Sequence, residues 1–507
     1  MISKQSIKQA SILIAGVSIA SQGLGVIREA LLANYLGTSS DYDLLLISMA
    51  LPMMIANILF LAIPSAGIPF LQGREKSTET GDHVLKSSFV RTNSLVTLLV
   101  AATLFIALPL LRDILARGLD DAQLDRFVKY GRLFCIVIPI KAYEGIYRTL
   151  LQYRRNFLFP ALTILGFNFV SITILFTLFP SLGTTAFIMS WLMGLFAQML
   201  IVAVPTYILF RRQGGSAGGF EFESSGYLKY LGIIVLVESF GLIVEPFDRY
   251  LAGTFLTPGF VSANYYAMMI SSVPIRIFIY AMGTAIFPSL SEYAAGGRIA
   301  DAGRLYHKTL SICAALIIPL SVYLYLYSDT IIKTILERGL FGVESRQMTV
   351  EVLRYYLIGL IFMAAFFIQL RVTFAVKSWR FMILTRLFSF AVKIIIGFAF
   401  IRSNWALAIG GGTAAMFIIS FISIEIFISH YLKFRYSRED MKLFFKSALI
   451  AVVLTGLMVG TNLIIRLIFS PDPIVVMLVV GAISFGVFLL LEFRFRLTGF
   501  FRKSVLK

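Results

Sequence analysis

The sequence predicts an all-α polytopic membrane protein with about fourteen transmembrane helices. Hydrophobic residues make up 58% of the 507-residue chain and the mean hydropathy is +0.85, values too high for a soluble multidomain protein. Apolar windows of about 20 residues, the length that crosses a bilayer core of about 30 Å, recur from one end to the other. Little sequence is left for a domain outside the membrane.

The predicted spans follow one another closely along the chain. They are residues 9–36, 43–72, 87–111, 127–153, 158–178, 183–210, 228–252, 262–291, 308–328, 349–376, 381–401, 405–430, 444–465 and 474–493. Glycine and proline recur within them, which in membranes permits close packing and bending. Pro246 in particular predicts a kink in the seventh span.

A glycine-rich connector at residues 211–229 divides the spans into two groups of six. We therefore expect an N-terminal lobe (1–212), a cytoplasmic linker (213–226), a C-terminal lobe (227–435), and a final helix pair with a basic cytoplasmic tail (436–507). Residues 37–52 align without gaps on residues 259–274. An even number of spans per lobe gives both lobes the same orientation, as in parallel repeats that rock around a site near the midplane.

The formal charge of +18 is explained mainly by topology. Most lysines and arginines of the connectors fall on the side that also carries both termini, which predicts cytoplasmic termini and no nucleic-acid partner. Cys135 and Cys313 lie within predicted spans and lack the spacing of metal ligands, and the three histidines are scattered. We expect neither a disulfide framework nor a metal site.

Basic residues within the spans are the strongest functional signal. A lysine or arginine at the bilayer centre costs roughly 2.5–3.5 kcal/mol, so it usually faces a wet cavity on a transport pathway. Five candidates, drawn from both lobes, predict one shared site for an anionic substrate: Arg28, Lys141, Arg148, Arg276 and Arg371. Others have milder interpretations: Lys129, Arg132 and Arg354 near the outer interface, Arg386 and Lys393 snorkelling to the inner surface, and Arg249 pairing with acidic neighbours.

Acidic residues accompany these cations at helical spacing. Lys141, Glu144 and Arg148 share one face, which indicates either a neutralised triad that docks the helix or a stripe lining a cavity. Glu238, Glu245 and Arg249 share a face of the seventh span, which indicates either salt-bridge structure or a coupling site. Glu29 and Asp43 complete the acidic candidates. No cofactor is expected beyond Na⁺ or H⁺ coupling, and the membrane potential alone is the other possible drive.

Two segments carry a family resemblance. Residues 25–37, Gly-Val-Ile-Arg-Glu-Ala-Leu-Leu-Ala-Asn-Tyr-Leu-Gly, followed by Asp43 and Pro52, and residues 265–291 with Tyr-Tyr-Ala and Gly-Thr-Ala-Ile-Phe-Pro-Ser-Leu-Ser, resemble the MurJ/MviN-like lipid flippases. These form a branch of the multidrug/oligosaccharidyl-lipid/polysaccharide (MOP) exporter superfamily. The resemblance implies a V-shaped, two-lobed transporter of the bacterial cytoplasmic membrane, not an enzyme, that flips an undecaprenyl-diphosphate-linked saccharide by alternating access.

The resemblance also implies which residues matter. Arg28 matches an essential arginine of the family and Asp43 its acidic neighbour, but Gln22, Ala56 and Met269 stand where the family has arginines that help to bind diphosphate. This departure favours a surface polysaccharide or exopolysaccharide repeat unit as cargo over lipid II. A MATE-like multidrug cation antiporter and a membrane polysaccharide polymerase are further alternatives. The expected partners are the lipid-linked saccharide, membrane lipids and polysaccharide synthesis enzymes, with the chain itself a monomer.

Overall fold

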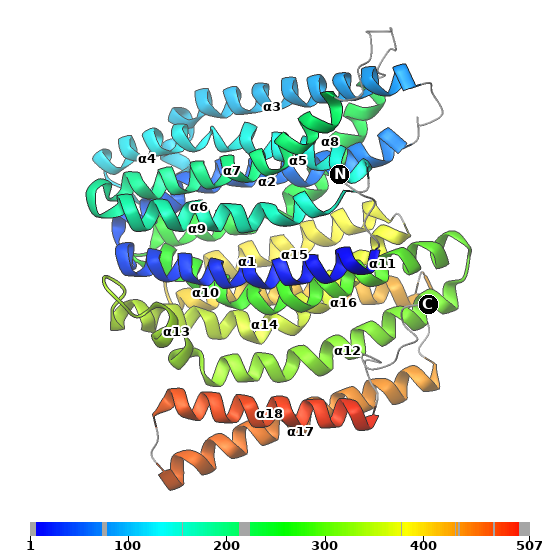
Figure 1. Ribbon diagram of the computed structural model, residues 1–507. Coiled ribbons are helices and arrows are strands. Elements are labelled where there is room, and N and C mark those ends of the chain that lie inside the picture. The colour runs from blue at the N-terminus through cyan, green and yellow to red at the C-terminus, as the bar shows by residue number, and fades with distance from the viewer. Residues whose placement is uncertain are drawn as a thin grey trace. The chain divides into compact units, whose positions relative to one another are not determined.

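The computed structural model describes residues 7–72, 79–154, 156–211, 224–376, 378–430, 432–433, 437–469 and 472–495, and no strand occurs among them. Its helices are α1 (Ile7–Leu36), α2 (Ser40–Gln72), α3 (Glu79–Leu115), α4 (Asp121–Phe134), α5 (Val137–Tyr153), α6 (Leu158–Leu182), α7 (Thr184–Arg211), α8 (Ser224–Leu242), α9 (Val244–Phe255), α10 (Phe260–Pro274), η1 (Ile275–Ile279), α11 (Tyr280–Ala295), α12 (Ile299–Leu326), α13 (Ser328–Leu336), α14 (Val343–Ala375), α15 (Trp379–Phe400), η2 (Leu407–Gly411), α16 (Gly412–His430), α17 (Arg438–Phe469) and α18 (Pro473–Phe495) (Figure 1). The predicted all-α class is confirmed.

Each predicted span coincides with one helix or with consecutive helices. Within the described ranges, ten helices are long and apolar enough to cross a membrane, and the number is eleven if the bent pair of α8 and α9 is counted as one span. The windows at α1, at α4 with α5, and at α10 to α11 are not among them. A span needs about 20 residues, whereas α4, α5, α10 and α11 have 14, 17, 15 and 16. The predicted number of fourteen spans is therefore not confirmed.

Prolines explain two of the breaks. Pro139 and Pro246 are each the third residue of a helix, α5 and α9 respectively. A proline has no N–H to donate to the carbonyl four residues earlier, so the preceding turn cannot continue as a regular helix. The fourth predicted span accordingly breaks at Cys135 and Ile136, and the seventh breaks at Ile243 with a bend of 41°. The kink predicted from Pro246 is confirmed.

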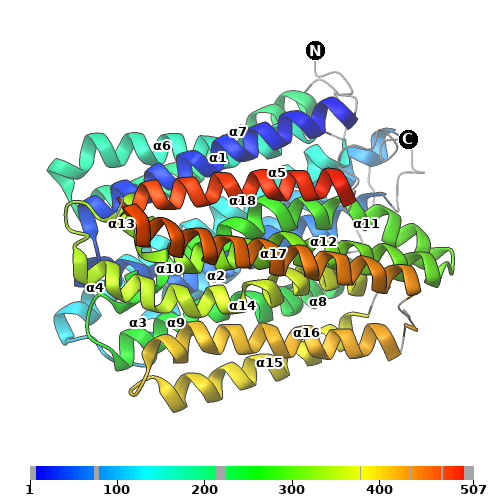
Figure 2. The same cartoon turned by 90° about the horizontal axis from the view of Figure 1, so that it is seen from below.

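The chain divides into two compact units. Unit 1 comprises residues 1–262 and 338–342, and unit 2 comprises residues 263–337 and 343–507. In unit 1, α2 packs against α4, α5, α8 and α9, while α6 packs against α1 and α7. In unit 2, α14 packs against α11, α12 and α16; α17 lies along α12, and α18 lies beside α17 (Figure 2). The structure thus groups α8 and α9 with unit 1.

The lobe boundaries drawn from the sequence stay a prediction. Most of the linker proposed at residues 213–226, together with residues 496–507 of the basic tail, lies outside the described residues. The internal repeat has a structural counterpart, because Gly37 (φ +54°) and Gly259 (φ +104°) both adopt backbone angles that favour glycine just before a helix begins. The N–H of Gly37 donates to the carbonyl of Ala33 at 2.9 Å and closes α1.

Candidate functional site

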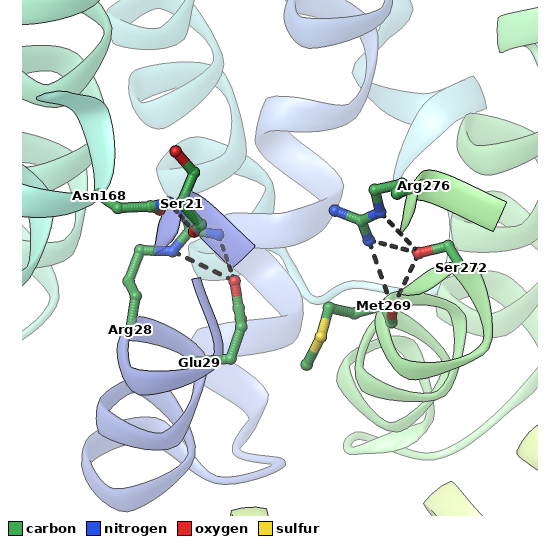
Figure 3. Close-up of polar contacts among 7 residues, drawn as sticks. All are labelled: Ser21, Arg28, Glu29, Asn168, Met269, Ser272 and Arg276. Atoms are coloured by element: carbon green, nitrogen blue, oxygen red, sulfur yellow. Dashed lines mark hydrogen bonds and ion pairs between the residues drawn. The ribbon is translucent and has the colours of Figure 1, made fainter. Parts of the chain in front are cut away.

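Arg28 is anchored inside unit 1 by three helices. It forms an ion pair with Glu29, and its Nη1 donates to Oδ1 of Asn168 on α6 at 3.1 Å (Figure 3). Its guanidinium carbon lies 4.8 Å from the ring centre of Phe167 and 5.4 Å from that of Trp191, within the range of cation–π attraction. The side chain is 12% exposed. Arg28 is therefore held in one orientation, with a small part of its surface accessible.

Lys141, Glu144 and Arg148 form the triad that their spacing predicts. Nζ of Lys141 lies 2.7 Å from one oxygen of Glu144, and Nη2 of Arg148 lies 2.9 Å from the other. Arg148 also donates to Oγ1 of Thr163 on α6 at 2.9 Å, and Nζ of Lys141 lies 3.7 Å from the ring centre of Phe60 on α2. One carboxylate thus holds two cations while the group docks α5 against α2 and α6. The role of the triad in lining a cavity stays a prediction.

Asp43 has a structural role that sequence reasoning missed. Its two carboxylate oxygens accept the backbone N–H groups of Gly259 at 2.6 Å and Ser262 at 2.8 Å, and the residue is 5% exposed. A carboxylate on α2 therefore satisfies N–H groups at the start of α10, which helices leave without internal partners. The partners lie 216 and 219 positions away in the sequence. No local pattern could have identified them.

The acidic residues predicted for the seventh span are divided between two helices. Because the helix breaks at Ile243, Glu238 lies on α8 whereas Glu245 and Arg249 lie on α9, and the shared face of the three residues stays a prediction. Arg249 pairs with Glu245, as predicted, and its Nη1 donates to the carbonyl of Leu46 on α2 at 2.5 Å. The side chain of Arg249 is 5% exposed and that of Glu245 is 43% exposed. The pair joins α9 to α2 and leaves the carboxylate accessible.

Arg276 lies in the π-helical turn η1, directly after α10 ends at Pro274. Such turns are frequent at functional sites. The exposed side chain folds back along its own helix: Nε and Nη2 donate to Oγ of Ser272, the former at 3.1 Å, and Nη2 donates to the carbonyl of Met269 at 3.3 Å (Figure 3). The guanidinium therefore lies beside Met269, one of the positions where the family resemblance expects an arginine.

Arg371 packs closely against a glycine of the second family segment. Its Nε lies 3.2 Å from the place that a Cβ on Gly283 would occupy. The glycine therefore provides the space through which the side chain passes between α14 and α11. Arg371 is half-buried, and it forms no ion pair or hydrogen bond with any residue that the structure describes.

Lys393 contradicts its prediction. It is fully buried, and its Nζ donates to Oγ1 of Thr413 at 2.6 Å and to the carbonyl of Ile409 in η2 at 3.2 Å. The expectation that it snorkels to the surface is wrong, because oxygen acceptors are available inside unit 2. Arg386 is half-buried, with its guanidinium carbon 5.7 Å from the ring centre of Phe366.

A buried polar cluster in unit 2 was not predicted. The hydroxyl of Tyr306 and Nε2 of Gln369, the latter at 2.9 Å, both donate to one oxygen of Glu425. Nδ1 of the neighbouring His307 lies 3.6 Å from Oδ2 of Asp440. The cluster joins α12, α14, α16 and α17. Its only sequence signal was a tyrosine next to a histidine, which does not indicate carboxylates on two distant helices.

Thiols and other metal-ligating groups do not gather in the described part of the chain. Cys135 and Cys313 are free and are 4% and 0% exposed. Across the described ranges, histidine, cysteine, aspartate and glutamate side chains form no group of three or more that could hold a metal ion.

Comparison with known proteins covers most of the chain. The family model described as "Lipid II flippase MurJ" matches residues 32–483. A "Probable lipid II flippase MurJ" of Borreliella burgdorferi is 24% identical over 354 residues, which is 68% of each chain. Another of the same name, from Rhizobium tropici, is 26% identical over 361 residues, covering 69% of this chain and 67% of the relative.

A solved structure supports the same fold. The structure titled "Lipid II flippase MurJ, inward closed conformation" aligns with a TM-score of 0.78 and 20% identity, over 95% of this chain and 99% of the other. The family match begins at Leu32, so the assignment of Arg28 to the essential family arginine rests on its motif. The chain belongs to the MurJ family of lipid flippases, transport proteins of the MOP superfamily rather than enzymes.

Proposed function

We propose that this protein moves lipid II, the undecaprenyl-diphosphate-linked precursor of peptidoglycan, from the inner to the outer leaflet of the bacterial cytoplasmic membrane by alternating access. The observation that carries this proposal is the family match over residues 32–483. The relatives' names support lipid II, which the sequence had ranked below a surface polysaccharide unit. We further propose that the chain acts as a monomer with both termini in the cytoplasm.

The basic side chains supply the chemistry that a diphosphate needs. A charged group entering hydrocarbon is strongly disfavoured unless it is paired. Guanidinium groups pair bidentately with phosphate oxygens and stay charged when buried. In this proposal Arg28, Arg276 and Arg371 are the diphosphate ligands, with Lys141 and Arg148 contributing through the net positive charge of their triad.

The lost family arginines are partly compensated. Met269 cannot bind phosphate, but the guanidinium of Arg276 folds back to the Met269 carbonyl at 3.3 Å. A cation is thus present at this level of α10, although it comes from a residue two turns later. This arrangement supports a rearranged diphosphate site, rather than a change of cargo, as the meaning of the altered position.

The charge of the cargo offers a driving force. Moving one charge through 100 mV corresponds to about 2.3 kcal/mol, and an inside-negative potential favours outward movement of an anion. Coupling to Na⁺ or H⁺ through Glu238 or Glu245 is the alternative. Transport measured in vesicles with and without an imposed potential, in the absence of ion gradients, separates the two.

The experiment that tests the cargo is depletion of the protein, followed by identification of the lipid-linked intermediate that accumulates on the cytoplasmic side. Lipid II is the expected intermediate. Accumulation of a different oligosaccharide would overturn the proposal. It would favour the second candidate, a surface-polysaccharide flippase, which the substitutions Gln22 and Ala56 at family arginine positions support.

The proposed site has its own test. Arg28→Ala and Arg276→Ala are each expected to abolish export while the protein inserts at normal levels. Lys333→Ala, which removes an exposed cation from α13, is the matched control and should export normally. Normal export by either arginine variant would exclude that residue from the transport site.

A further inference from the structure

Unit 2 contains a cavity of about 490 Å³ where the end of α12, the start of α13 and one face of α14 come together. The residues of α14 that line it recur at three- and four-residue spacing and therefore share a face of the helix. The lining used below consists of Tyr325, Asp329, Glu351, Arg354, Tyr355 and Ile358. None of these residues belongs to the proposed diphosphate site.

Arg354 is an oriented but incompletely satisfied cation. Its Nε donates to Oγ of Ser328 at 3.3 Å, and its guanidinium carbon lies 5.6 Å from the ring centre of Tyr325. Its two terminal nitrogens form no hydrogen bond or ion pair with the residues that the structure describes. These nitrogens are the ones that form a two-pronged contact with a phosphate group.

The surroundings of Arg354 are not suited to a strongly anionic ligand. Glu351 lies one turn earlier on α14, and one of its oxygens accepts Nε1–H of Trp405 at 3.2 Å. Asp329 pairs with Arg346 at 3.3 Å, and Arg346 also pairs with Glu337 at 3.1 Å. Three carboxylates therefore accompany two guanidinium groups. A ligand that carries a positive group beside its phosphate matches this balance better than one with negative charge alone.

The cavity lies at the level expected for lipid headgroups. Residues 355–370 of α14 carry no charge, whereas the preceding part of the helix contains Glu344, Arg346 and Glu351, so the polar start of α14 ends at Arg354. Arg354 therefore marks one boundary of the apolar region. Ile358 is 57% exposed and Tyr325 is 40% exposed, so an apolar wall continues from the cavity toward the bilayer.

We propose that this cavity binds the headgroup of a zwitterionic, amine-bearing phospholipid. The phosphate contacts the terminal nitrogens of Arg354, the ammonium group contacts Glu351, and an acyl chain follows the surface at Ile358. Such a lipid bridges α12, α13 and α14 from outside the transport pathway. The inference is independent of the cargo, because no residue of the proposed diphosphate site takes part.

Native mass spectrometry of the delipidated full-length protein tests this inference. Phosphatidylethanolamine and phosphatidylglycerol are titrated separately, and bound lipid is counted for each variant. The wild type is expected to bind phosphatidylethanolamine at least threefold more tightly than phosphatidylglycerol. Arg354→Gln should weaken that binding about tenfold, whereas Glu351→Gln should remove the preference between the two lipids. Lys333→Gln, which removes an exposed cation of α13, is the control and should match the wild type.

Several results of these binding measurements would contradict the proposal. Equal binding of the two lipids by the wild type, or unchanged phosphatidylethanolamine binding by Arg354→Gln, would overturn the proposal. If Arg354→Gln does not fold, Arg354→Lys keeps the charge without the planar fork and is expected to bind several-fold more weakly; wild-type affinity in this variant would reject the phosphate contact. Soluble glycerophosphoethanolamine is expected to compete only weakly, and competition equal to that of the lipid would exclude a membrane lipid as the ligand.

Discussion

Replacement of Asp43 tests whether its carboxylate has a structural role or takes part in transport. Its oxygens accept two backbone N–H groups at 2.6 and 2.8 Å in a site that is 5% exposed. Alanine would leave both donors unsatisfied, at about 1–3 kcal/mol each, whereas asparagine keeps one acceptor and should cost about half as much. At roughly 1–2 °C per kcal/mol for a protein of this size, Asp43→Ala should lower the melting temperature by on the order of 5 °C and Asp43→Asn by about half as much.

Thermal unfolding in detergent micelles, together with lipid II transport in vesicles, provides the measurement. If Asp43 is a cap, stability falls in the order wild type, Asp43→Asn, Asp43→Ala, and transport per folded molecule stays within about twofold of wild type. Asp41→Asn is the matched control, because Asp41 is 52% exposed and its pair with Arg126 lies on the surface, where such pairs contribute about 0–1 kcal/mol. Wild-type stability combined with lost transport in Asp43→Asn would refute the capping role.

Three further predictions follow from buried or crowded groups. Glu144→Gln leaves two cations without their shared carboxylate, so thermal unfolding should show a loss of about 3–5 kcal/mol, part of which Lys141→Met restores in the double variant. Gly283→Val should displace the guanidinium of Arg371 and lower transport toward the level of Arg371→Gln, with no additional loss when both changes are combined. Lys393→Cys should react with a water-soluble maleimide only after denaturation, because position 393 is fully buried; rapid labelling of the folded protein would contradict this placement.

Apolar windows were sufficient to predict the helical architecture. The bilayer requires backbone groups to be satisfied within each segment, so a long apolar run is a helix whatever its neighbours are. Pro246 likewise acts on its own helix, and its kink was readable from the sequence. The break before Pro139 was not predicted, although the same argument applies to it. The grouping of α8 and α9 with unit 1 depends on tertiary packing, which hydropathy does not report.

Only those contacts of the candidate site that join residues close in the sequence could be predicted. Pairs at three- and four-residue spacing, such as Glu144 with Arg148 and Glu245 with Arg249, form because the helix itself brings them together. This rule applies within an unbroken helix, and Ile243 separates Glu238 on α8 from Glu245 and Arg249 on α9. The partners of Asp43 and Lys393 come from other helices, and their identity could not be inferred from periodicity.

Burial, more than position along a span, decides what a membrane-level charge does. Lys393 and Arg276 both lie within predicted spans, yet the first is fully buried against oxygen acceptors and the second is exposed and held by its own helix. The prediction for Lys393 was wrong because it used only the distance of the residue from the membrane surface. The oxygen acceptors that make burial possible come from distant positions and could not be inferred. An enclosed cation with its acceptors in place contributes to packing. Arg371 is half-buried and forms no ion pair or hydrogen bond with the described residues, so it is a stronger transport candidate than Lys141, whose ammonium is already paired with Glu144 and 8% exposed.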